Sequence, residues 1–164
     1  MILHIHSDAC HLSEPQARSR AGGHLYLSNK NSPKPNGPIH TISPIMKNVM
    51  SSAAEAEIGA VFTNCQDSEP IHTALFEMGH DQHPTPIQTD NSTTAGFLNE
   101  TIKQKRTKAI DMRFFWVIDR IQQNHFRLYW KPGSENLIDF FTKHHSPAHH
   151  QRMRPHFIHD PTKT

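Results

Sequence analysis

The chain has 164 residues and a formal net charge of +2, and 35% of its residues are hydrophobic while 20% are charged. This length and composition are typical of one globular domain with a core, and they exclude an intrinsically disordered chain. No apolar run approaches the ~20 residues that cross a bilayer, and no basic segment precedes a hydrophobic one, so we expect neither a membrane span nor a secretory leader.

The first fifty residues predict three short strands. Residues 2–7 are rich in aliphatic side chains and end at a polar break, so we expect a strand that presents Asp8 at its end. Residues 24–28 alternate apolar and polar side chains, and residues 39–43 form a third strand-like segment. Because turn residues join these segments, the pattern indicates an antiparallel meander.

The middle of the chain predicts a long helix, a shorter helix and a strand. From Ser51, apolar residues recur at three- and four-residue spacing, which indicates an amphipathic helix. A separate helix is expected over residues 70–78, because Gly79 follows as a stop signal. Residues 85–89 then form a brief strand, and the Asp90 carboxylate follows at its end.

The remaining elements are a small-residue helix over residues 91–98, an amphipathic helix over 107–123 and a strand over 126–130. The turn KPGSEN comes next, and a final helix begins in the segment LIDFF, so that Asp139 opens a helix after a turn. The predicted order of elements along the chain is therefore β-β-β-α-β-α-β-α.

The C-terminal end of the sequence carries no strong pattern. Residues 144–164 hold six histidines and little apolar periodicity, and we expect a domain over residues 1–148 followed by a poorly ordered tail over 149–164. A zinc site is not expected there, since the tail has no CxxC unit and no clear HxxxH pair on a predicted helix. Cys10 and Cys65 are too few for a disulfide framework, so we expect both to be reduced.

Charge is divided unevenly along the chain. Residues 1–100 hold five Lys or Arg against ten Asp or Glu, a balance of −5, and residues 101–164 hold twelve against five, a balance of +7. Basic residues mixed with aromatics suit a polyanion with stackable bases, so we expect a nucleic-acid contact in the segment KQKRTK. Its cations are Lys103, Lys105, Arg106 and Lys108. The competing interpretation is that this segment is only a solvated helix entry.

Four acidic segments occur in a fixed order, around Asp8, Glu57, Asp90 and Asp139. Three of them lie where an apolar run ends or a helix begins, which holds a carboxylate rigidly and leaves it open to solvent. Mg²⁺ prefers oxygen ligands, and carboxylates that converge from separate elements can hold two ions for phosphodiester hydrolysis. The pattern therefore predicts a two-metal site.

Six segments in this order resemble the RNase H domain of copia-type LTR retrotransposon polyproteins. They are HSDA, ARSRAGGHLYLS, KNVMSSAAEAEIGA, PTPIQTDNSTTA, KRTKAIDMRFFW and YWKPGSENLIDFFTKHH, within residues 3–148. The resemblance implies a ribonuclease H-like α/β fold, with a mixed five-stranded sheet flanked by helices. It also implies cleavage of the RNA strand of an RNA–DNA hybrid with two Mg²⁺ ions, for which Mn²⁺ can substitute. The implied parent polyprotein includes a reverse transcriptase region, and its expected location is a cytoplasmic retroelement particle or the nucleus.

The resemblance also implies that Asp8, Glu57, Asp90 and Asp139 are the metal ligands and catalytic residues. Helical periodicity does not separate Glu57 from Glu55, because both lie at the margins of the apolar stripe. The family pattern selects Glu57. Glu55 has another role available, as a favourable charge in the first turn of the helix.

Three further alternatives concern the fourth acid and the function. Asp111 is a rival to Asp139, but a position inside a helix beside Arg113 is typical of a surface ion pair. The KPGSEN turn lacks the histidine that cellular RNase H enzymes commonly carry before the last acid. A catalytically silent nucleic-acid-binding fragment of a decayed element is the alternative to a nuclease, and the presence of all four acids favours the nuclease. An integrase of the same fold is disfavoured, since Asp139 follows a fifth strand.

Overall fold

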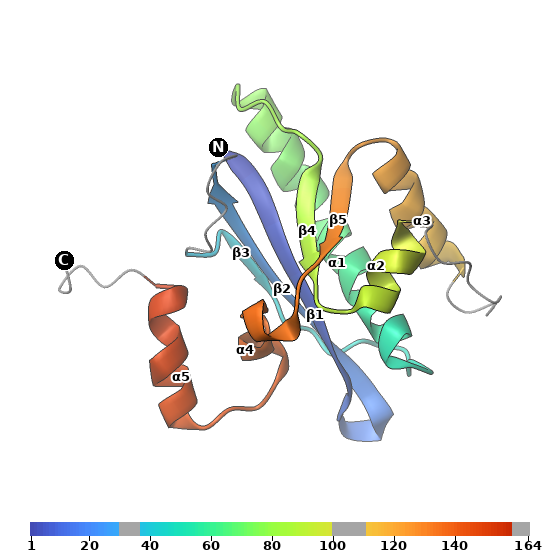
Figure 1. The fold of residues 1–164 in the computed structure, drawn as a ribbon, viewed down its shortest axis with the longest axis vertical. Coiled ribbons are helices and arrows are strands. Elements are labelled where there is room, and N and C mark those ends of the chain that lie inside the picture. The colour runs from blue at the N-terminus through green and yellow to red at the C-terminus, as the bar shows by residue number, and fades with distance from the viewer. Residues whose placement is uncertain (30–36, 100–110, 159–164) are drawn as a thin grey trace.

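The structure is a computed structural model that describes residues 1–29, 37–99 and 111–158, and one mixed β-sheet forms its centre (Figure 1). The strands lie in the order β3-β2-β1-β4-β5. β1, β2 and β3 are antiparallel neighbours, whereas β4 is parallel to β1 and β5 is parallel to β4. The strands are β1 (Ile2–Glu14), β2 (Arg18–Ser28), β3 (His40–Ile42), β4 (Thr85–Thr89) and β5 (Phe126–Trp130). The expected five-stranded mixed sheet and the antiparallel meander are thus confirmed.

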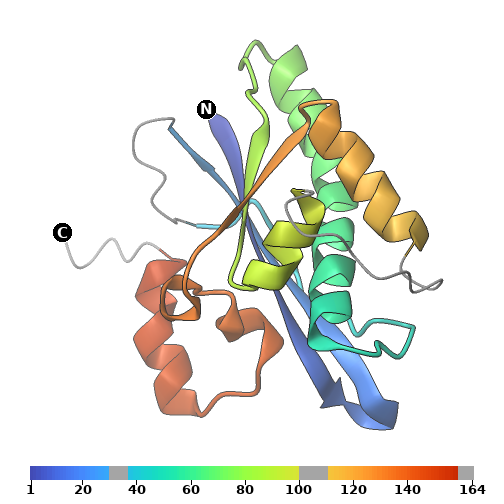
Figure 2. The same ribbon diagram turned by 45° about the vertical axis from the view of Figure 1, so that its right-hand side comes forward.

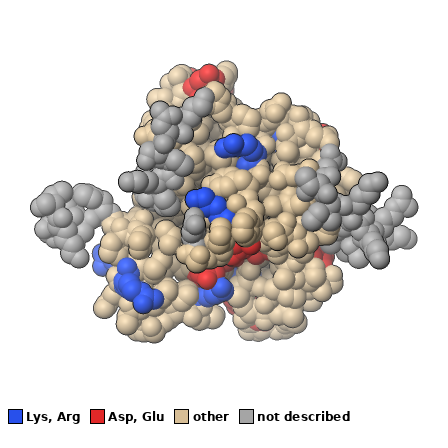
Figure 3. Space-filling model, in the orientation of Figure 1, with Lys and Arg blue, Asp and Glu red and all other residues tan. Residues whose placement is uncertain are grey.

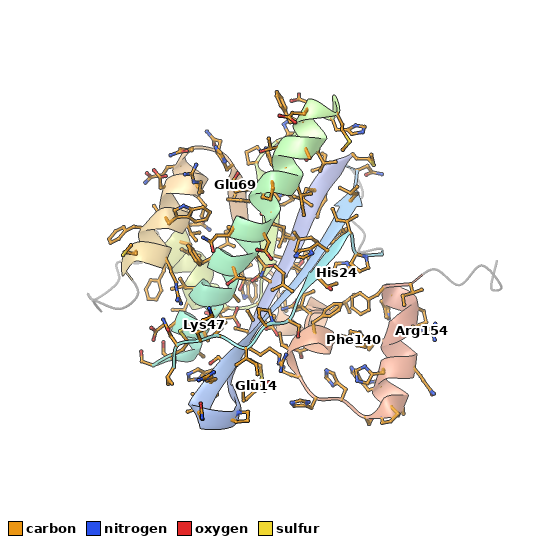
Figure 4. All side chains as sticks on the ribbon, turned by 180° about the vertical axis from the view of Figure 1, so that it is seen from behind. Glu14, His24, Lys47, Glu69, Phe140 and Arg154 are labelled. Atoms are coloured by element: carbon orange, nitrogen blue, oxygen red, sulfur yellow. The ribbon has the colours of Figure 1, made fainter. Side chains whose placement is uncertain are left out.

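The longest helix covers one face of the sheet (Figure 4). It is accompanied by four shorter helices and by the 3-10 turns η1, η2 and η3 within the described residues. The elements are α1 (Ala53–Glu77), α2 (Ser92–Leu98), α3 (Asp111–Gln122), α4 (Asp139–Thr142), α5 (Pro147–Met153), η1 (Pro15–Ala17), η2 (Gly133–Glu135) and η3 (Arg154–His156). Among the described residues, no helix is both long enough and apolar enough to cross a bilayer.

The apolar core lies between the sheet and α1, with α2 and α3 packed beside α1 (Figure 2). Side chains alternate along a strand, so every second residue of β1 and β2 turns toward α1 and the others turn away from it. The buried side chains that meet in this core include Leu3, Ile5, Leu25, Ile58, Val61, Ile87 and Leu98. The core therefore fixes the position of the first turns of α1 relative to β1.

The first hairpin is longer than the sequence predicts. The expected break at Ser7 and Asp8 is wrong, since β1 continues to Glu14 and pairs along most of its length with β2. Asp8 lies opposite Gly22 within this pairing. The polar residues stay in the strand because the backbone groups of the two strands satisfy one another across the hairpin.

Helix α1 is continuous, so the predicted separate helix over residues 70–78 is wrong. Pro70 lies inside α1 and has no N–H to donate to the carbonyl of Gln66. Both residues are exposed, so water can satisfy that carbonyl and the helix continues. Gly79 follows the helix with a φ of 85°, in agreement with its predicted role as a stop signal.

The face of the sheet turned away from α1 carries buried polar rings. Tyr26 Oη lies 3.0 Å from His6 Nε2, and the ring of His4 stacks on Tyr26 with 5.4 Å between centroids. Burial lowers the pKa of His6 to about 3, with neighbouring positive charges adding to the effect, and burial followed by the Arg127 charge lowers the pKa of His4. These two histidines are therefore neutral in the folded protein at physiological pH.

Up to residue 158, the C-terminal segment differs from the poorly ordered tail expected over residues 149–164, and residues 159–164 lie outside the described residues. α5 and η3 occupy residues 147–156, and Phe157 is buried against the rings of Phe140 and Phe141. The ring of His24 on β2 also contacts Phe157, so this aromatic cluster ties the segment to the sheet (Figure 4). Sparse aromatic anchors of this kind give no periodic signal in the sequence.

Candidate metal centre

The register of two parallel strands brings Asp8 and Asp90 side by side. β1 and β4 pair at His6 and Gln88, and each aspartate lies two residues beyond this pair on its own strand path. The two carboxylates therefore start from equivalent positions, although they are separated by 82 positions in the sequence. Asp8 is only 4% exposed, and Asp90 is half-buried.

Glu57 reaches the same point from α1. Its Oε1 accepts a hydrogen bond from the backbone N–H of Ala9 at 3.0 Å, and its side chain is buried. One oxygen each from Asp8, Glu57 and Asp90 lies within 4.8 Å of the others. We call these three carboxylates the acidic cluster. Atoms of acidic residues also form a central patch on the surface seen in Figure 3, with basic atoms beside it.

Glu55 does not enter the acidic cluster. Its Oε2 accepts from the backbone N–H of Ser51 at 2.6 Å, and its own N–H donates to Ser52 Oγ at 3.1 Å. Ser52 is the N-cap of α1, so Glu55 completes a reciprocal cap at the helix start. The structure therefore places Glu57 at the cluster and Glu55 at the cap, a choice that helical periodicity left open.

Asp139 lies beside the acidic cluster but is not a member of it. It begins α4, and its Oδ1 accepts from Lys143 Nζ at 2.7 Å. Its charge contributes to raising the pKa of Asp8 and of Glu57, so it is close enough to act on both. Asp111, its rival in the sequence, begins α3.

Two residues of this site, Gly22 and Thr142, escaped the sequence analysis. Thr142 is almost fully buried, and its hydroxyl donates to Asp8 Oδ2. A Cβ placed on Gly22, which lies opposite Asp8, would clash with Thr142 Cγ2. Glycine therefore permits α4 to approach the hairpin this closely. The signal in the sequence is that Thr142 and Lys143 follow Asp139 by three and four residues, a spacing that brings all three to one side of a single helical turn.

The β5–α4 connection lies against Asp90. The indole N–H of Trp130 donates to the backbone carbonyl of Asp90 at 2.9 Å. A Cβ placed on Gly133 would lie 3.0 Å from Asp90 Oδ2, so the backbone of this turn closely approaches the carboxylate. Asn91 then caps α2 by accepting from the Thr94 N–H at 2.9 Å. The approach of Gly133 thus restricts where the Asp90 side chain can point, while the hydrogen bonds of Trp130 and Asn91 fix the backbone around it.

Two members of the acidic cluster, Glu57 and Asp8, hold protons more strongly than ordinary carboxyl groups do, because the pKa of each is raised. Burial raises the pKa of Glu57 to about 9, and the charges of Asp8 and Asp90 add to this, while the N–H of Ala9 opposes it. Burial also raises the pKa of Asp8 to about 6, against the lowering effect of the hydrogen bond from Thr142. Without a cation, charge repulsion and burial together disfavour full ionisation of this cluster.

The residues present fit a divalent cation. Glu57 Oε2 is buried and has no hydrogen-bond partner among the described residues, and it belongs to the cluster of converging carboxylates. A buried acceptor without a donor is costly unless another group binds it. Carboxylate oxygens are the ligands that Mg²⁺ and Mn²⁺ prefer, and such an ion would satisfy the lone pairs and offset the repulsion.

The predicted basic contact cannot be placed on this site. Lys103, Lys105, Arg106 and Lys108 lie outside the described residues. Their contribution to nucleic-acid binding therefore stays a prediction from the sequence.

Comparisons of the sequence with known proteins give a distant relative. No protein-family model matches the chain. Over 142 residues, or 87% of the chain, it is 24% identical to the Nicotiana tabacum protein "Retrovirus-related Pol polyprotein from transposon TNT 1-94", of which it spans 10%.

Solved structures give the clearer likeness. LC11-RNase H1, isolated from compost by a metagenomic approach, has a TM-score of 0.63 at 14% identity, covering 85% of this chain and 91% of that one. The same enzyme in complex with an RNA/DNA hybrid has a TM-score of 0.62, at 12% identity, covering 85% of this chain and 93% of that one. The N-terminal RNase H domain of a Mycobacterium tuberculosis protein has a TM-score of 0.62 at 11% identity, covering 87% of this chain and 96% of that one. The chain has a ribonuclease H-like fold.

Proposed function

We propose that this chain is a metal-dependent endoribonuclease that cleaves the RNA strand of RNA–DNA hybrids. The observation that carries the proposal is the acidic cluster, in which Asp8, Glu57 and Asp90 converge from three separate elements. The proposal is supported by the likeness of the fold to an RNase H1 that has been solved with an RNA/DNA hybrid. The similarity to a Pol polyprotein supports an origin in a retrotransposon, for which the sequence favours the copia type.

In the proposed mechanism, Asp8, Glu57, Asp90 and Asp139 would hold two Mg²⁺ ions, or Mn²⁺ in their place. Such ions would lower the pKa of a water molecule that attacks the phosphate and would stabilise negative charge on the leaving oxygen. Asp8 is oriented by Thr142, so its carboxylate is preorganised for this task. Glu57 and Asp8 must give up any bound protons as the ions enter, so metal affinity should increase with pH.

The proposed partners follow from the same assignment. The substrate is an RNA–DNA hybrid, and the reverse transcriptase region of the parent polyprotein is the source that would deliver it. We place the protein in a cytoplasmic retroelement particle or in the nucleus, as the origin in a retroelement implies. The matched Pol polyprotein is much longer than this chain, which spans a tenth of it.

Cleavage of a labelled hybrid should require a divalent cation. We expect product with Mg²⁺ or Mn²⁺ and none with EDTA, because the cluster cannot position the phosphate and water without a cation. Gel analysis of a hybrid with label on the RNA strand measures this directly. Duplex DNA of the same sequence is the control. Equal cleavage in EDTA, or equal cleavage of duplex DNA, would contradict the proposal.

A catalytically silent nucleic-acid-binding domain is the second candidate. It is favoured by one observation, the ion pair that engages Asp139 and leaves it outside the acidic cluster. The same assay separates the two functions. A protein that binds the hybrid and two metal ions but yields no product over a range of Mg²⁺ concentrations would be the silent domain.

The basic segment KQKRTK should contact the phosphates of the hybrid. Replacing Lys103, Lys105, Arg106 and Lys108 together by alanine should weaken hybrid binding at any sequence, because each lost phosphate contact removes counterion release. The slope of log affinity against log salt should flatten by up to about 0.9 per contact. Fluorescence-anisotropy titrations at several salt concentrations measure both quantities. If the quadruple variant keeps the wild-type affinity and slope, the segment is a solvated helix entry.

A further inference from the structure

Lys143 is a positively charged residue that lies beside the acidic cluster and pairs with Asp139. Its Nζ is 2.7 Å from Asp139 Oδ1, one helical turn earlier on α4. The charge of Asp8 also acts on it, and these attractions outweigh partial burial and raise the pKa of Lys143. Of the four predicted metal ligands, Asp139 is the one that lies outside the acidic cluster. Within the described residues it forms an ion pair with Lys143.

The backbone of α4 is anchored independently of this ion pair. Thr142 is buried, its hydroxyl bonds to Asp8, and its methyl group fills the space that Gly22 leaves open. The side chains of Asp139 and Lys143 are instead 39% and 47% exposed. A change of partner at Asp139 therefore needs only side-chain rotation, while the helix stays against the hairpin.

An exposed ion pair of this kind is weak, because water and salt screen it. It can hold Asp139 in the absence of a stronger cation, yet it cannot compete strongly with a divalent ion that also contacts the acidic cluster. The charge of Asp139 contributes to the raised pKa of Asp8 and Glu57, so its carboxylate also acts electrostatically on a cation held by those residues.

We propose that Lys143 is an internal counter-ion that occupies Asp139 until a divalent cation displaces it. This inference rests on the proposed metal-dependent function. The ion held by Asp8, Glu57 and Asp90 then binds first, and the ion that needs Asp139 binds second and more weakly. Lys143 is thus a positioning residue that sets the order and the concentration at which the site fills.

The test is a titration of the folded chain with Mn²⁺. Binding is measured from the electron paramagnetic resonance signal of free Mn²⁺ and, independently, by calorimetry. Lys143→Met removes the charge and keeps the length of the stem, and it should tighten the weaker ion by about fivefold, a factor that matches the loss of a weak exposed ion pair. Lys143→Arg keeps the cation and should retain the wild-type affinity within about twofold. Arg154→Met, which removes a positive charge from η3, is the charge-matched control and should have no effect (Figure 4).

A double-mutant cycle shows whether Asp139 mediates the effect. Asp139→Asn should abolish the weaker ion, and adding Lys143→Met to it should change nothing further. The inference is overturned if Lys143→Met binds the weaker ion with wild-type affinity. It is also overturned if Lys143→Met tightens Mn²⁺ binding equally in the Asp139→Asn background, because Lys143 would then act by long-range electrostatics and not through Asp139. In both of these cases the wild type still binds metal and the proposed function stands. If neither the wild type nor any variant binds Mn²⁺, the proposed function itself fails.

Discussion

Replacing Asp8 or Asp90 by asparagine should reduce hybrid cleavage at least about a hundredfold. Loss of partners behind a metal ligand commonly costs about 10–100-fold, so loss of a ligand charge should cost at least the upper end of that range. The fold should persist, because asparagine has the same shape as aspartate. At position 8, its amide oxygen can still accept the hydrogen bond from the hydroxyl of Thr142. Removing one charge from a repulsive cluster should leave the metal-free protein as stable as the wild type, or more stable.

Initial rates at saturating Mg²⁺ measure the loss, and circular dichroism establishes that each variant is folded. Asp67→Asn is a matched control, since Asp67 lies on α1 with an exposed side chain and bonds to His40. It should cleave at the wild-type rate. If Asp8→Asn and Asp90→Asn cleaved as fast as Asp67→Asn, the acidic cluster would not be the catalytic site.

Glu57→Gln should abolish cleavage and at the same time stabilise the metal-free protein at neutral and alkaline pH. The introduced amide would keep an oxygen to accept from the N–H of Ala9, and its NH₂ group would donate to the neighbouring carboxylates. The variant would also avoid the burial of a charge. The stability gain should grow across the pH range in which wild-type Glu57 is ionised only in the unfolded chain, and it should be largest above that range.

The sign of this effect follows from the raised pKa of Glu57. Its pKa rises from an ordinary value of 4.5 to about 9 on folding, so between these values the folded state binds the extra proton. Stability from this group is therefore present below pH 4.5 and is lost as pH rises toward 9, by ~1.4 kcal/mol per unit. The buried histidines act oppositely and only below their unfolded pKa of 6.5, because His4 and His6 have lowered values.

The difference in unfolding free energy between Glu57→Gln and the wild type isolates the contribution of Glu57. Urea unfolding in EDTA at about pH 5, 7 and 9 should show a difference that grows with pH and is on the order of 3 kcal/mol at pH 7. Glu55→Gln is the matched control two residues away. It should retain cleavage and lose at most about 1 kcal/mol at every pH, because it only weakens an exposed helix cap. A pH-independent difference for Glu57→Gln would contradict the raised pKa.

Local sequence patterns predicted most elements of this fold. Alternation and turn residues located β3, β4 and β5, and the change to helical spacing after Ser51 located the start of α1. Gly79 marked the end of that helix. The errors arose where tertiary packing outweighs local preference, as in the long hairpin of β1 and at Pro70, whose exposed position in α1 tolerates a missing hydrogen bond.

The sequence by itself determined which carboxylates are available and the kind of element that carries each one. Only the tertiary structure decided which of them meet, because the register between β1 and β4 places Asp8 beside Asp90 and spacing along the chain contains no information about that register. Likewise, helical periodicity left Glu55 and Glu57 equivalent, and the packing of α1 on the sheet distinguished them. The hydrogen bond from Thr142 to Asp8 was decided by the close approach of α4 to the hairpin at Gly22, which depends on two surfaces meeting and so leaves no periodic trace in either segment.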